Sequence, residues 1–158
     1  AEIMLMQGKV AENKEEARKM LEEVVTSGKA FETFKDMVKA QGGNVDMIEN
    51  PELLPQSKFK TEIKSEESGN VKVLHSERLG VLAMQLGAGR ETKEQDVNHA
   101  VGLELACKRG DKVNKGDTIC IVYHDEELKP QWVDELYHAF ELTNEEVAPQ
   151  PIIEKVLS

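Results

Sequence analysis

Two short turns with the same Gly-Asp ending constrain the fold of this chain more than any other feature. Arg109-Gly110-Asp111 and Asn114-Lys115-Gly116-Asp117 lie on either side of one apolar residue, Val113. Glycine tolerates the backbone angles of tight turns, and aspartate accepts hydrogen bonds from nearby backbone N–H groups. The pattern Gly-Asp-x-Val-x-x-Gly-Asp therefore predicts two reversals of chain direction around one inward-facing side chain.

The sequence around these turns mixes strand and helix signals between residues 59 and 158. Alternating apolar and polar residues predict strands, and apolar residues at helical spacing predict helices. The strands are expected at 59–64, 71–75, 101–107 and 118–123, the helices at 79–86 and 130–142, a helical or turn segment at 96–100, and residues 152–157 are compatible with a closing strand. Because strands and helices do not alternate strictly, the pattern favours an α+β fold.

Residues 1–43 are predicted to be helical. Asn13 and Glu16 fit an N-cap with its capping-box partner, and Ser27-Gly28 and Gln41-Gly42-Gly43 fit helix ends. The apolar run Ala1–Met6 has no cap before it, so we expect a helix that continues upstream and a chain that is a piece of a longer protein. A processed N-terminus or a removed tag is the alternative.

Residues 44–58 are predicted to be a linker. Pro51 and Pro55 disfavour helix at the residues that precede them. We therefore expect a helical segment at 1–43, a linker at 44–58 and an α+β domain at 59–158.

Charge and composition exclude several classes of protein. The chain has 158 residues, 39% of them hydrophobic, with 30 acidic against 20 basic residues and a formal net charge of −10. A surface this negative argues against binding to nucleic acid or to anionic lipid, and no run of about 18 apolar residues predicts a membrane span. The first residues lack a basic leader, and two cysteines do not make a disulfide framework, so we expect a reduced, cytoplasmic protein.

The segment Gly87-Ala88-Gly89-Arg90 is the first candidate for chemistry. Backbone N–H groups of a glycine-rich turn and a guanidinium both favour an anion, and a small independent enzyme could use such a site. The spacing matches neither a P-loop nor a dinucleotide fingerprint. We therefore favour a helix end followed by a tight turn.

The histidines and cysteines are the second set of candidates. Metal-site spacing is absent among the four histidines, His75, His99, His124 and His138. His124-Asp125 lies at a predicted strand end, where a catalytic base could lie, but we interpret His124 as a turn residue. Cys107 and Cys120 lie in predicted strands, where a thiol acts as a small buried hydrophobe, and without a Cys-x-x-Cys pair we expect no zinc.

The double turn resembles that of biotinyl and lipoyl carrier domains, which use a similar Gly-Asp-x-Val-x-x-Gly pattern. The resemblance implies barrel-sandwich (hammerhead-like) character for the second region. Carriers also display a lysine on a tight hairpin, whereas Lys72 falls in a predicted strand. A standalone barrel-sandwich binding or carrier-like module without a prosthetic-group lysine is thus the alternative function.

A longer, ordered set of motifs resembles the C-terminal part of the pyrimidine-nucleoside phosphorylase and thymidine phosphorylase family. The shared pieces are Ser68-Gly69-x-Val71, Leu79-Gly80-Val81-x-Ala83, Leu86-Gly87-Ala88-Gly89-Arg90, Asp96, Ala100-Val101-Gly102 and the double turn, preceded by Glu15-Glu16-Ala17-Arg18, Ser27-Gly28-Lys29-Ala30, Phe34 and Gln41-Gly42-Gly43. The resemblance covers nearly the whole chain, and residues 149–158 are the stretch that departs from it.

The family resemblance implies a function for the parent protein and a passive role for this chain. Family members convert a pyrimidine nucleoside and phosphate into the free base and a pentose 1-phosphate, as pentosyltransferases. The family's catalytic, pyrimidine-contacting and phosphate-binding residues, and its potassium site, lie upstream of the matched part. The resemblance therefore implies no catalytic, cofactor-binding or metal-binding residue here, a missing N-terminal part as partner and a homodimeric parent.

Overall fold

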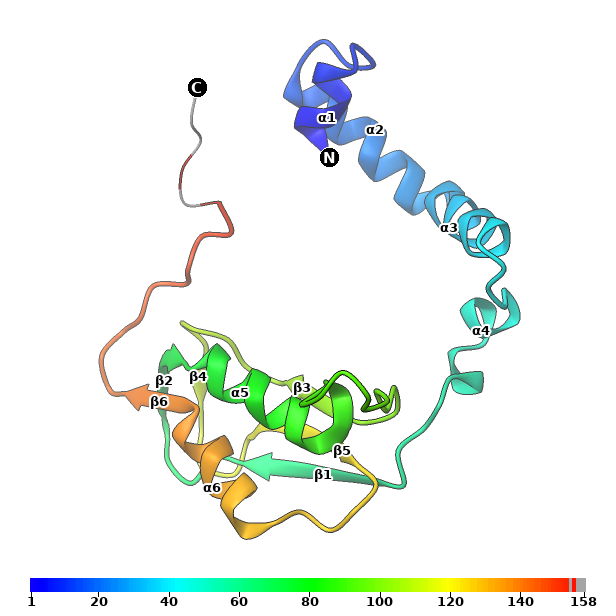
Figure 1. The fold of residues 1–158 in the computed structure, drawn as a ribbon. Coiled ribbons are helices and arrows are strands. Elements are labelled where there is room, and N and C mark those ends of the chain that lie inside the picture. Colours follow the sequence, from blue (N-terminus) through cyan, green and yellow to red (C-terminus); the bar gives the residue numbers. More distant parts are fainter. Residues whose placement is uncertain (154, 156–158) are drawn as a thin grey trace. The chain divides into compact units, whose positions relative to one another are not determined.

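Residues Ala1–Leu54 and Pro55–Ser158 form two separate units. The structure, a computed structural model, describes residues 1–153 and 155. The first unit is helical, and the second combines helices with antiparallel sheets (Figure 1). The predicted α+β class is therefore confirmed. No closed barrel forms among the described strands, and the barrel-sandwich detail stays a prediction.

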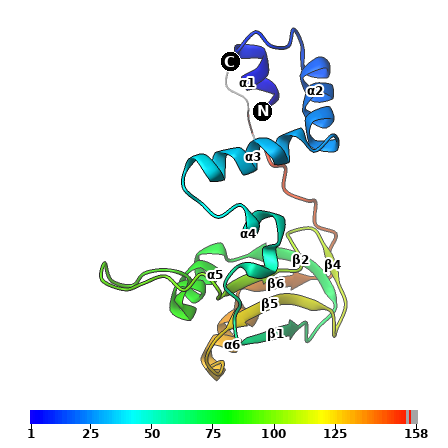
Figure 2. The same cartoon turned by 90° about the vertical axis from the view of Figure 1, so that its right-hand side faces the viewer.

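The first unit consists of short helices, and capping residues set their limits. They are α1 (Glu2–Gln7), α2 (Lys14–Thr26), α3 (Lys29–Ala40), α4 (Asp46–Glu49) and the 3-10 turn η1 (Pro51–Leu53). Asn13 Oδ1 accepts the Glu16 N–H at 2.9 Å, and the Glu16 carboxylate accepts the Glu12 N–H at 2.8 Å. The predicted capping pair is therefore present, with the return bond displaced by one residue. Helix α1 packs beside α2 (Figure 2).

Most large apolar side chains of the first unit are exposed. Ala11 and Ala17 are its only buried residues. The exposed ones are Ile3, Met4, Val10, Val24, Val25, Phe31, Phe34, Met37, Leu53 and Leu54. Because burial of an amphipathic face supplies most helix stability in proteins, these helices lack much of their usual stabilisation within this unit.

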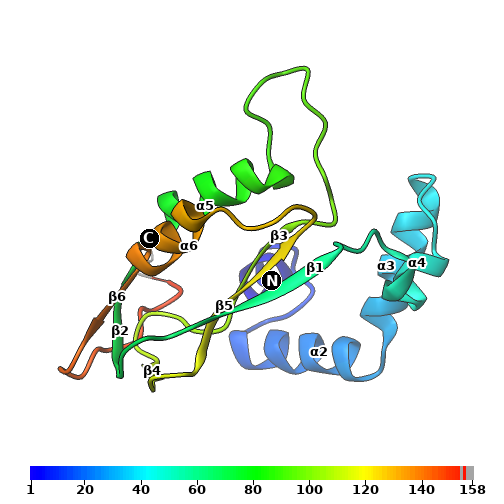
Figure 3. The same cartoon turned by 90° about the horizontal axis from the view of Figure 1, so that it is seen from below.

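Two three-stranded antiparallel sheets build the second unit. One has the order β1-β5-β3 and the other the order β4-β2-β6. The strands are β1 (Phe59–Lys64), β2 (Gly69–Leu74), β3 (Gly102–Leu105), β4 (Lys112–Val113), β5 (Thr118–His124) and β6 (Phe140–Thr143). Helices α5 (Ser76–Ala83), extended by a π-turn η2 (Met84–Ala88), and α6 (Pro130–His138) pack against each other (Figure 3). The loop between η2 and β3 projects from this body.

The two Gly-Asp turns have matching hydrogen bonds. Asp111 Oδ2 accepts the N–H of Lys108 at 2.8 Å, and Asp117 Oδ2 accepts the N–H of Asn114 at 2.8 Å. The glycine before each aspartate has a positive φ, of 95° and 92°. Val113, between the turns, is 3% exposed. The turns therefore reverse the chain around one buried side chain, as the pattern predicts.

The hydrophobic core of the second unit lies between the two sheets and the two helices. Its residues are mostly aliphatic, in keeping with an aromatic content of 4%. The buried members are Ile63, Val71, Leu79, Leu82, Cys107, Val113, Ile119, Cys120, Val122, Leu136, Ala139 and Phe140. Since the core joins both sheets to α5 and α6, it fixes the loops that carry the candidate site residues.

Several predicted element limits are wrong. The helix predicted to reach residue 142 ends at His138, because Phe140 pairs with Leu74 in the ladder between β6 and β2. The helix predicted at 79–86 begins earlier, at Ser76. Strand β2 therefore ends at Leu74 and not at residue 75 as predicted. Strand β3 is shorter than the predicted 101–107, and the linker contains α4 and η1. For the helical or turn segment predicted at 96–100, the structure has no helix and a turn at residues 99–100.

The predicted closing strand at 152–157 is not present in the part that the structure describes. Ile152 and Ile153 are exposed and belong to no strand. Residue 154 and residues 156–157 of this prediction lie outside the described residues. The apolar pair therefore takes no part in either sheet.

Among the described residues, none of the helices combines the length and the apolar character that crossing a bilayer would need.

Candidate functional site

The glycine-rich segment and His124 come together at one pocket of the second unit. Gly87 and His124 line a cavity of about 260 Å³ together with Asp96, Asp125 and Glu126. All of its charged lining residues are carboxylates, which repel an anion. The pocket therefore does not support the anion site considered for Gly87–Arg90.

Gly87 closes the helix that begins at α5. Its φ of 106° is open to glycine and strained for other residues, and its carbonyl accepts the Asn98 N–H at 2.9 Å. A side chain at Gly89 would approach the Met84 Cβ to 3.1 Å. Arg90 follows as an exposed residue. The favoured interpretation, a helix end followed by a tight turn, agrees with this geometry.

His124 is buried at the end of β5, and both of its ring nitrogens are engaged. Nδ1 lies 2.6 Å from the Glu126 carbonyl oxygen and Nε2 lies 2.8 Å from Thr61 Oγ1. Since a carbonyl oxygen only accepts, Nδ1 carries a proton, and in the neutral ring Nε2 accepts from the Thr61 hydroxyl. The Phe59 ring stacks on the imidazole at 5.4 Å. The two bonds fix the imidazole in one orientation, between the Thr61 hydroxyl and the Glu126 carbonyl.

Asp125 joins three segments of the second unit. One carboxylate oxygen accepts the Lys58 N–H at 2.8 Å, and the other accepts the Asn98 side-chain amide at 2.8 Å. The bond from the Lys58 N–H, followed by that from Asn98, lowers the pKa of the Asp125 carboxyl. The carboxylate is therefore an ionised structural acceptor that fixes the start of β1 and the loop before β3.

The remaining histidines lie apart from this pocket. His75 precedes α5, and its Nε2 lies 2.6 Å from the Glu141 carboxylate across the β2–β6 pair. His138 Nδ1 bonds the Asp134 carbonyl within α6 at 2.8 Å, and His99 is exposed on the projecting loop. The four histidines are thus distributed over separate elements, and the structure does not bring them together.

The two cysteines are buried thiols of the core. Cys120 lies in β5, whereas Cys107 follows β3, and neither forms a disulfide. Burial raises the pKa of Cys107, and burial together with the nearby Cys107 raises that of Cys120 to about 11. Because the thiolate is the reactive form, neither side chain suits a nucleophile.

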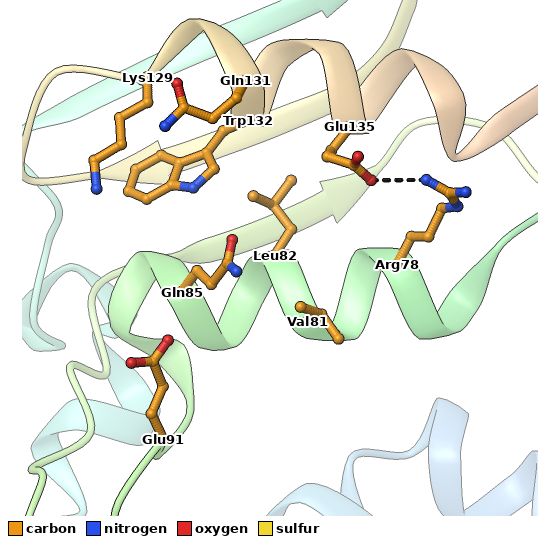
Figure 4. Close-up of a pocket in the computed structure, with 9 residues that line it drawn as sticks. All are labelled: Arg78, Val81, Leu82, Gln85, Glu91, Lys129, Gln131, Trp132 and Glu135. Carbon is orange, nitrogen blue, oxygen red and sulfur yellow. Dashed lines mark hydrogen bonds and ion pairs between the residues drawn. The ribbon is translucent and has the colours of Figure 1, made fainter.

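A larger pocket lies between α5 and α6, and the sequence did not indicate it. Its volume is about 620 Å³, and the side chains of Leu82 from α5 and Trp132 from α6 lie between the two helices (Figure 4). Arg78 and Glu135 form an ion pair of 2.9 Å across the two helices, and Lys129 Nζ lies 4.5 Å from the centre of the Trp132 ring. The lining residues include no nucleophile with a neighbouring base.

Within the described part of the chain, no three or more His, Cys, Asp or Glu residues are grouped as a metal site. The potassium site implied by the family resemblance is expected upstream of this sequence, and that expectation stays a prediction. The candidate residues described here thus make structural hydrogen bonds beside open pockets.

A domain match and two relatives show which kind of known protein this chain resembles. Residues 70–143 match the family model of the pyrimidine nucleoside phosphorylase C-terminal domain. The chain is 39% identical over 149 residues to the pyrimidine-nucleoside phosphorylase of Bacillus subtilis strain 168, which covers 94% of this chain and 34% of the relative. It is 39% identical over 155 residues to that of Staphylococcus aureus strain USA300, covering 98% of this chain and 36% of the relative.

The second unit is therefore an α+β domain of the type that ends these phosphorylases. The chain matches the C-terminal part of members of the pyrimidine-nucleoside phosphorylase family. It spans about a third of the length of the curated relatives that it matches.

Proposed function

We propose that this chain is the C-terminal part of a pyrimidine-nucleoside phosphorylase and acts there as a non-catalytic scaffold. The whole protein would convert a pyrimidine nucleoside and phosphate into the base and a pentose 1-phosphate. The observation that carries the proposal is the 39% identity to such phosphorylases over 98% of the chain.

The contacts of the candidate residues support a scaffold. Phosphorolysis requires phosphate held beneath the sugar carbon and polar groups placed against the departing base. In this chain, His124 and Asp125 already make two hydrogen bonds each to neighbouring segments, and the thiols are buried and protonated. These groups hold the fold, so the reacting groups are assigned to the upstream part.

The exposed apolar side chains of the first unit support an upstream partner from the same protein. The first unit buries only two alanines, while Phe31, Phe34 and Met37 on α3 are between 41% and 49% exposed. About two thirds of each relative lies outside the part that this chain matches. Packing of the upstream part on these helices would remove the apolar surface from water. A homodimeric parent, a potassium ion in the upstream part and a cytoplasmic location belong to the same proposal.

Substitution of exposed polar residues in the longer protein tests the scaffold role. Arg90→Ala and His99→Ala remove an exposed cation and an exposed imidazole of the projecting loop. We expect kcat/KM for uridine and thymidine to change by less than about twofold, because neither group would touch the reacting atoms. A fall of about 100-fold, the usual effect of losing an acid–base group, would contradict the scaffold role.

The double turn keeps one alternative open, a standalone barrel-sandwich module related to carrier domains. Carrier domains hold a covalent cofactor on a lysine, whereas the proposed module has none. The intact mass of the chain purified from its host tests whether it is a carrier domain. A mass increase that maps to a lysine would favour a carrier and would count against the phosphorylase scaffold.

A further inference from the structure

A basic cleft lies beside strand β2 in a chain that is strongly acidic elsewhere. Its volume is about 510 Å³, and Lys72, Lys108 and Arg109 line it. Lys72 is on β2, whereas Lys108 and Arg109 belong to the first Gly-Asp turn. Three cations at one cleft are unusual here, because the chain as a whole has a formal charge of −10.

These three cations have no carboxylate partner among the described residues. Asp111 is the one carboxylate in the described lining, and its Oδ2 accepts the Lys108 N–H at 2.8 Å within the turn. Like charges held close together repel one another. An anion in the cleft would relieve this repulsion and pair with all three side chains.

The guanidinium of Arg109 is held in place for such a contact. Its Nε donates to the Lys72 carbonyl oxygen at 3.1 Å, which leaves both terminal nitrogens for a ligand. A guanidinium presents these donors in a planar fork that matches two oxygens of a phosphate group. Ser76, the first residue of α5, also lines the cleft, and no side chain caps that helix end. Unpaired N–H groups at a helix start add to the attraction for an anion.

Apart from Ser76 and Gln150, the rest of the lining is apolar, which suits a ligand larger than a bare anion. Val73 and Leu74 contribute from β2, and Pro149 contributes from the chain after β6. Pro149 lies against the turn, since a Cβ at Gly110 would stand 3.0 Å from its Cα. The volume lies in the range of small-molecule sites, about 300–1,000 Å³. A phosphate among the cations leaves room for an organic group against these apolar side chains.

We propose that this cleft binds a small phosphomonoester, with the phosphate held by Lys72, Lys108 and Arg109 and the organic group against Val73, Leu74 and Pro149. The inference is independent of the proposed phosphorolysis. It rests on the charge and shape of the cleft.

Calorimetric titration of the 158-residue chain at low salt tests the proposal. The probes are ribose 5-phosphate, inorganic phosphate and ribose. We expect saturable binding of ribose 5-phosphate, weaker binding of inorganic phosphate and no binding of ribose. Amide chemical shifts recorded with ribose 5-phosphate are expected to change at residues 72–76 and 108–111.

Matched double variants separate a built site from general charge attraction. Lys72→Gln with Lys108→Gln removes two cations of the cleft, whereas Lys112→Gln with Lys115→Gln removes two exposed lysines that do not line it. We expect the first pair to weaken ribose 5-phosphate binding about tenfold or more, because charge-assisted contacts are strong, and the second pair to weaken it less than about twofold.

Three results would overturn the proposal. The first is an absence of saturable ribose 5-phosphate binding. The second is inorganic phosphate binding as tightly as the ester, which would mean that the organic group is not contacted. The third is an equal effect of the two double variants, whether large or small, which would mean that the anion binds elsewhere or only through net charge.

Discussion

Replacing Leu136 by alanine tests whether the second unit is held by the core described above. Leu136 is 1% exposed on α6, and the same core cluster includes Val71 and Val122, which are 0% and 1% exposed. Both valines lie on paired strands, so they cannot move far to fill a cavity. Leucine-to-alanine changes in cores cost about 2–5 kcal/mol, and poor collapse of the cavity places Leu136→Ala at about 3–4 kcal/mol.

Urea unfolding followed by tryptophan fluorescence measures this cost in the second unit alone. Trp132 is the one tryptophan of the sequence and lies on the same helix. With a denaturant slope of about 1–3 kcal/mol per molar urea, we expect the midpoint to fall by about 1–4 M. Val81→Ala is the control, because Val81 is 44% exposed on α5. A Leu136→Ala shift no larger than that of the control, at an unchanged slope, would refute the proposed core.

Three further predictions concern turns, a carboxylate and the thiols. Gly110→Ala should destabilise the second unit more than Gly116→Ala. Both glycines have a positive φ, but an added Cβ would meet backbone atoms at 3.0 Å only at Gly110, so the urea unfolding midpoint should fall further for Gly110→Ala. The pKa of the Asp125 carboxyl is lowered in the folded state, so the carboxylate stabilises the fold above its unfolded pKa of about 3.9, and this stabilisation is lost as pH falls through the folded pKa. Asp125→Asn should therefore make the free energy of unfolding depend less on pH in acid. An unchanged pH dependence below about pH 5 would contradict this prediction. Cys107 and Cys120 should react with a thiol reagent at pH 8 only after urea is added, and rapid native labelling would show that they are not buried.

Local signals in the sequence were sufficient where neighbours in the chain decide the structure. The cap at Asn13, the two Gly-Asp turns and the alternation in β5 involve bonds or side chains within a few residues. The end of α6 could not be found in this way. Phe140 continues the helical spacing, but it pairs with Leu74, which is distant in sequence, and that pairing ends the helix.

The candidate site shows the same division. A buried role for the cysteines followed from their strand-like surroundings. The role of His124 did not, because its ring bonds Thr61, 63 residues away, as well as Glu126 nearby. Similarly, Lys72 and Arg109 are ordinary surface cations in the sequence, and only the fold brings them to one cleft.

The most direct test of the scaffold role is base release by the isolated chain. The 158-residue chain is incubated with uridine or thymidine and inorganic phosphate, and free uracil or thymine is measured against a mock preparation that excludes host phosphorylase. We predict no release above the mock level, and activity only in the longer protein that includes the upstream part. Phosphate-dependent release that follows the purified chain would contradict the scaffold role, because it would require reacting groups within these residues.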